Sequence, residues 1–192
     1  MAISHLGIGK EVGNVETDRG QEAEAFNRFY TVTRDELLEG FVWPFATVEV
    51  ALGLVEEDPT NEWAYSYRYP SNCLKIRKIQ SGQRTDTIDS RIPLKISRDG
   101  TGKLIYCDIE DAVLEYTFRE NDPGRFSNLF ITALSYIIAF KMAPRLTKGD
   151  PFKLGNRAFE AAKLWLSMAE AHAANEEVPD VEPESDSIRS RY

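Results

Sequence analysis

The chain has 192 residues, of which 42% are hydrophobic and 28% are charged, as expected of a globular protein that buries a core. Its net charge of −8 argues against a general affinity for nucleic acid, because neutralising phosphates requires a cationic surface. The charge is uneven: residues 68–103 hold nine Lys/Arg and three Asp, a net of +6, so the remainder carries −14. This asymmetry favours contacts between oppositely charged subunits, although a solvated basic hairpin would have the same composition.

The first third of the chain is predicted to be helical. Apolar residues recur every three or four positions from Phe26 to Phe41, which predicts an amphipathic helix over 19–39. Pro44 predicts another short helix within 41–52, since a missing N–H costs little in the first turn. We therefore expect helices over about 19–52.

The pattern becomes alternating between residues 63 and 119, which predicts a small antiparallel sheet of about four or five strands. A loop over 57–61 leads into it. Its first strand places four aromatic side chains on one face, and Pro70 ends it. The stripe predicts either a core face or a surface that joins two subunits. Its members are Trp63, Tyr65, Tyr67 and Tyr69.

Two further helices are predicted over 122–175, each beginning at an Asp-Pro pair. The most apolar run, 128–143, contains Lys141 and is shorter than the ~20 apolar residues of a membrane span, so we predict a buried helix. Residues 1–175 are expected to form one domain. Residues 176–192 carry many acids and two prolines, which predicts either an extended docking tail or an ordinary chain end.

Residue types that carry catalysis are sparse. The chain has two histidines and two cysteines, without the spacing of a metal site or a nucleophile triad, so no metal or cofactor is expected. The cysteines are interpreted as reduced side chains of a protein made in a cytoplasm. A pair of carboxylates that hydrolyses glycosides is defined by distance and stays open, with these candidates: Glu36, Glu39, Asp108 and Glu110.

Three segments together resemble the head-to-tail adaptor proteins of tailed bacteriophages, in particular the tail tubular protein A type of short-tailed phages. They are WPFATVEVAL (43–52), WAYSYRYPSNCLKI (63–76) and the run from Tyr106 to Thr147, and the resemblance covers roughly residues 20–175. The matching residues are Trp43, Phe45, Ala46, Trp63, Tyr65, Tyr67, Pro70, Cys73, Leu74, Ala143, Leu146 and Thr147.

The resemblance implies a mainly α fold with a β insertion: an antiparallel helical bundle, a small antiparallel sheet or hairpin, and an extended C-terminal tail. It implies a non-enzymatic protein at the head–tail junction of the virion, synthesised in the cytoplasm of the host bacterium. About twelve copies would form a ring under the portal protein. The ring would contact the next tail component, which is a nozzle or tail tube. DNA would pass through the bore without specific binding, and no contact with a membrane is expected.

The implied contact residues fall into two groups. The tail residues Ile188, Arg189, Arg191 and Tyr192 are the candidate portal anchors. A neighbouring subunit or tail protein would contact a second set, which is Trp63, Tyr65, Tyr67, Arg68, Lys75, Arg77, Lys78, Arg98 and Lys103.

Two other functions remain as hypotheses from the sequence. One is a virion-associated carbohydrate or peptidoglycan hydrolase that uses a carboxylate pair. The other is a small module that binds nucleic acid through the basic sheet, which salt-sensitive DNA binding would reveal.

Overall fold

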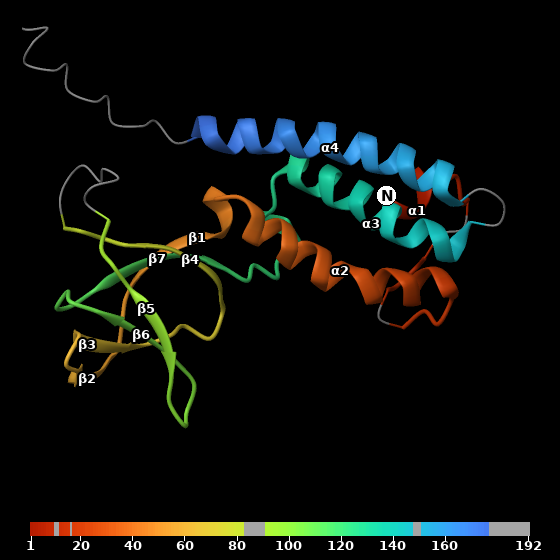
Figure 1. The fold of residues 1–192 in the computed structure, drawn as a ribbon. Coiled ribbons are helices and arrows are strands. Elements are labelled where there is room, and N and C mark those ends of the chain that lie inside the picture. The colour runs from red at the N-terminus through yellow and green to blue at the C-terminus, as the bar shows by residue number, and fades with distance from the viewer. Residues whose placement is uncertain (10–11, 16, 83–90, 148–150, 177–192) are drawn as a thin grey trace, which may run out of the picture.

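The computed structural model describes residues 1–9, 12–15, 17–82, 91–147 and 151–176 (Figure 1). Within these ranges the chain forms four α-helices and seven strands in two antiparallel sheets. The helices are α1 (Ala2–His5), α2 (Gln21–Gly40), α3 (Asn128–Leu146) and α4 (Pro151–Glu176), with short 3₁₀ turns at Pro44–Ala46 and Pro123–Arg125. The strands are β1 (Thr47–Ala51), β2 (Leu54–Thr60), β3 (Trp63–Arg68), β4 (Cys73–Ile79), β5 (Lys95–Arg98), β6 (Lys103–Cys107) and β7 (Val113–Phe118).

This is an α+β fold, and the prediction of a helical bundle with a small β insertion is wrong. The error lies in residues 41–61, where a helix and a loop were expected. Pro44 begins a single 3₁₀ turn, after which the chain forms β1 and β2. β1 is stabilised by its pairing with β7, where Val48 lies opposite Tyr116, and β2 by its pairing with β3. β7 is distant from β1 in the sequence, and the local periodicity of residues 47–60 does not identify the partner of either strand.

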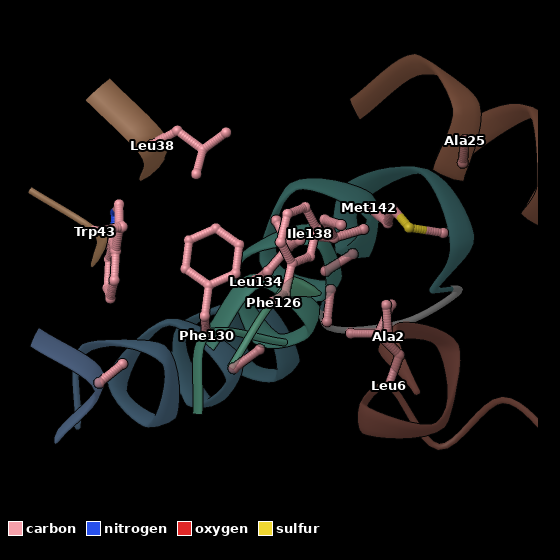
Figure 2. Close-up of a cluster of buried hydrophobic side chains, with 14 of the residues drawn as sticks. Ala2, Leu6, Ala25, Leu38, Trp43, Phe126, Phe130, Leu134, Ile138 and Met142 are labelled. Carbon is pink, nitrogen blue, oxygen red and sulfur yellow. The ribbon is translucent and has the colours of Figure 1, made fainter. Parts of the chain in front are cut away.

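The helices form a layer around one hydrophobic core (Figure 1). α3 lies between α2 and α4, and α1 also packs against α3. Figure 2 shows Trp43 at one end of this core beside Phe130, and Met142 and the α1 residues toward the other end. α4 packs closely against α3 at Gly155, where an added Cβ would lie 3.4 Å from Cβ of Ala143.

α3 begins six residues after the predicted start. The Asp122 carboxylate accepts a hydrogen bond from the Gly124 N–H at 2.9 Å, and this caps only the 3₁₀ turn. Ser127 is the N-cap of α3 and accepts from the Phe130 N–H at 3.2 Å. Among the described helices, α3 alone has the length and apolar composition of a membrane span, and 44% of its most apolar window is buried inside the protein.

The two sheets face each other across a second core. Sheet A has the strand order β1-β7-β4, and sheet B has the order β2-β3-β6-β5. The second core joins side chains of both sheets and comprises Tyr67, Ile79, Ile105, Cys107, Ala112, Leu114 and Tyr116. The β part is therefore a sandwich with its own core beside the helical layer.

Replacing Tyr67 by Phe is expected to lower the free energy of unfolding by about 1–2 kcal/mol, the value of a lost buried hydrogen bond. The Tyr67 hydroxyl is the group at risk: it donates to the Ile109 carbonyl at 2.7 Å and accepts from the Ala112 N–H at 3.5 Å. Urea unfolding measures the loss. Tyr106→Phe is the matched control, since that hydroxyl bonds to no described residue, and equal losses in both variants would contradict the assignment.

Candidate subunit interface

The aromatic stripe on β3 is mainly a core feature. Tyr67 is 1% exposed and lies in the second core, with Tyr65 and Tyr69 packed against that core. Burial is the main cause that raises the pKa of Tyr67, whereas the nearby Glu110 charge is the main cause that raises the pKa of Tyr65. Trp63 is half-buried, and its indole Nε1 is buried without a hydrogen-bond partner among the described residues.

Arg77 and Lys75 of β4 bind the C-terminal end of α2. The Arg77 guanidinium donates to the Phe41 carbonyl at 2.5 Å, to the Leu38 and Glu39 carbonyls at 3.3 Å, and to the Thr117 hydroxyl at 2.8 Å. Lys75 donates to the Glu39 carbonyl at 3.2 Å. Cations at this position satisfy carbonyls that have no partner within the helix and interact favourably with its dipole. Burial lowers the pKa of Arg77. Its hydrogen bonds connect the end of α2 to sheet A.

Lys78 forms an ion pair across the sheet with Glu115 of β7, at 3.4 Å between Nζ and Oε2. Glu49 of β1 lies opposite Glu115 in the strand register, and the three side chains share one shallow hollow beside Pro44. Two carboxylates thus lie close together here, with a lysine bound to one of them. This is the geometry of a cross-strand ion pair on a sheet.

The remaining predicted contact residues lie on the β5–β6 hairpin, except Arg68, which lies on β3 and binds that hairpin. Arg68 of β3 binds the Asp99 carboxylate through two nitrogens, at 3.1 and 3.0 Å. This bond is the main cause that lowers the pKa of Asp99 well below its usual range. The Lys103 ammonium lies 5.0 Å from the centre of the Tyr69 ring, and Arg98 is exposed.

Each sheet has one acidic and one basic outer strand. β1 and β2, on one edge of each sheet, lie within residues 47–60, which contain four acids and no Lys or Arg. β4 and β5, on the opposite edges, contain five Lys/Arg and no acid. The central strands β3, β6 and β7 carry one charged residue each. In the sheets, the acidic and the basic residues are therefore separated onto different outer strands.

Comparison with family models and with curated protein sequences gives no match.

Two of the candidate catalytic acids, Glu36 and Asp108, bind separate partners, and the two thiols are free. Within the described ranges, no three His, Cys, Asp or Glu side chains form a group that could hold a metal ion. Glu36 pairs with Lys141 on α3, and the Asp108 carboxylate accepts from the Ala64 N–H at 2.9 Å. Cys73 and Cys107 are not bonded to each other.

Sequence reasoning missed the acidic edge, because β1 and β2 were not predicted as strands. The alternation of Val48 and Val50 and the apolar pair at Leu54 and Val55 were the available indications. The predicted portal anchors Ile188, Arg189, Arg191 and Tyr192 lie outside the described residues.

Proposed function

We propose that this chain is a structural head-to-tail adaptor of a tailed bacteriophage. It would form a ring below the portal, connect the DNA-filled capsid to the tail, and let DNA pass through its bore. The proposal starts from the resemblance in three segments of the sequence. The residues that carry the first segment lie in the helical core, where Trp43 and Phe45 pack against Phe130.

The observation that carries the proposal is the placement of opposite charges on opposite edges of the same sheets. Copies related head-to-tail bring two different surfaces together, and such contacts close into a ring when the rotation permits. An acidic strand on one copy and a basic strand on the next supply complementary surfaces and a fixed direction. A net charge of −8 further supports passage of DNA, because an acidic bore repels phosphate.

The partners of such an adaptor are the portal protein, the next tail component and further copies of the chain. The C-terminal residues 188–192 are proposed to bind the portal, since they join an apolar and a basic tip to an acidic connecting segment. Assembly would follow synthesis in the host cytoplasm and would place the protein at the head–tail junction of the virion.

Deleting residues 182–192 is expected to abolish portal attachment while leaving the unfolding free energy unchanged. The described residues of both cores lie within residues 1–176, and the acid- and proline-rich composition of 176–192 does not favour a core. Purified protein is mixed with its portal protein, and the product is imaged by electron microscopy.

A second variant keeps the length of the chain and replaces four residues by Ala: Ile188, Arg189, Arg191 and Tyr192. It should lose portal attachment as the deletion does. Full attachment by either variant would refute the role of the tail. A full-length chain that never binds portal would refute the adaptor function.

A further inference from the structure

Sheet B ends on both sides in strands whose outer edges are unpaired within the part of the chain that the structure describes. β2 pairs only with β3, and β5 pairs only with β6. Both edges expose large apolar side chains: Leu54 is 51% exposed, Val55 43% and Ile96 53%. An unpaired edge with exposed apolar residues is a ready template for another strand.

The charges of the two edges are complementary. Glu56, Glu57 and Asp58 on β2 form no ion pair with a described residue. On β5, Arg98 forms none either, and among the described residues Lys95 pairs only with Glu62, at 3.8 Å and with both side chains more than half exposed. An exposed pair of that kind contributes little to stability, so it does not prevent Lys95 from binding another carboxylate.

Sheet A offers no such pair of edges. Its basic outer strand β4 lies against α2, where Lys75 and Arg77 bind the helix carbonyls. Only sheet B therefore has an acidic and a basic outer strand whose main described contact is the neighbouring strand of its own sheet.

The two edges also match in length. β2 pairs irregularly with β3 at two places: between Leu54 and Glu56, and between Glu57 and Thr60, where Asp58 has a φ of 48° and Pro59 lacks an N–H donor. The part of β2 before the second irregularity is Leu54–Glu57, which has as many residues as β5.

We propose that β2 of one copy adds to β5 of a second copy, so that sheet B continues from subunit to subunit. The inference rests on the proposed ring and names the contact that builds it. Main-chain hydrogen bonds between the strands would supply affinity, and the Glu56 and Glu57 carboxylates facing Lys95 and Arg98 would supply direction. Because the contact joins two different edges, every copy keeps one edge of each kind for its next neighbour.

Two charge reversals test the contact in the full-length protein. One variant carries Glu56→Lys and Glu57→Lys, and the other carries Lys95→Glu and Arg98→Glu. Each variant then has two edges of the same sign, so self-association should weaken roughly 100-fold or more, since facing like charges cost several kcal/mol. Sedimentation velocity over a range of protein concentrations measures the association.

Mixing the two variants should restore assembly, because the basic β2 of the first fits the acidic β5 of the second, and the reverse pair is native. The control variant carries Glu24→Lys and Arg28→Glu, two exposed charges on α2, and should assemble normally. Thermal unfolding of each variant establishes that it is folded. A native chain that stays monomeric, reversals without effect on assembly, or a mixture that does not recover would each overturn the edge pairing.

Portal binding distinguishes this inference from the proposed function. Single copies of the reversed variants should still bind portal through residues 188–192, but without a closed ring. If native chains assemble through these edges and never bind portal, the edge pairing stands and the adaptor function falls.

Discussion

Trp43→Ala is expected to lower the free energy of unfolding by about 3–5 kcal/mol, as for a fully buried aromatic residue in a well-packed core. The side chain is 0% exposed, and its indole N–H donates to the Leu37 carbonyl at 2.8 Å. Its ring centre lies 5.0 Å from that of Phe130 and 5.1 Å from that of Phe41. The substitution thus removes a hydrogen bond and a large part of the contact between α2, the Pro44 turn and α3. Guanidinium unfolding followed by circular dichroism measures the change.

Trp63→Ala is the matched control for this prediction. It removes the same atoms from a half-buried position whose Nε1 makes no hydrogen bond to a described residue, so the loss should be smaller. If both variants lose equal stability, the core assignment of Trp43 is contradicted. Should Trp63→Ala leave the monomer stable and weaken assembly, that indole lies at a contact between subunits.

Arg77→Leu is expected to destabilise the protein by about 3 kcal/mol, because it leaves several acceptors without their charged donor. The side chain is half-buried and connects three carbonyls at the end of α2 to Thr117 of β7. The loss should persist at high salt, since screening acts less on partly buried hydrogen bonds than on exposed ones. Urea unfolding at low and high salt measures it, and hydrogen exchange should rise first in the last turn of α2.

Lys75→Leu tests whether the effect belongs to the half-buried Arg77 guanidinium. Lys75 is exposed and makes one hydrogen bond to the same helix end, so we expect a loss below about 1 kcal/mol. A loss as large as that of Arg77→Leu would show that charge near the helix end dominates. No loss in either variant would show that the junction is held by apolar packing.

The helices were predictable because their information is local. The three- and four-residue spacing from Phe26 to Phe41 predicted the helix that α2 forms at Gln21–Gly40. The glycines at 100 and 102 predicted the turn between β5 and β6, where Asp99 also accepts hydrogen bonds from the backbone of the turn.

The first two strands could not be predicted in the same way. Residues 47–60 carry Glu, Asp and Pro, which have low strand preference, and Pro44 indicated a helix start. What holds β1 in place is β7, whose residues follow more than sixty positions later, as in the pair Thr47 and Thr117. Residues 47–60 alone do not identify β7 as the partner strand.

The amino-acid pattern alone predicts the helix at Gln21–Gly40, the concentration of basic charge in 68–103 and the aromatic strand at Trp63–Arg68. Long-range packing places Tyr67 in a core, brings Arg77 to the end of α2, and puts the acidic and basic strands on opposite edges. The two groups of features differ in the range of the interactions that produce them. Backbone preferences and side-chain periodicity act over a few residues, whereas strand order and burial arise from contacts between segments that are distant along the chain.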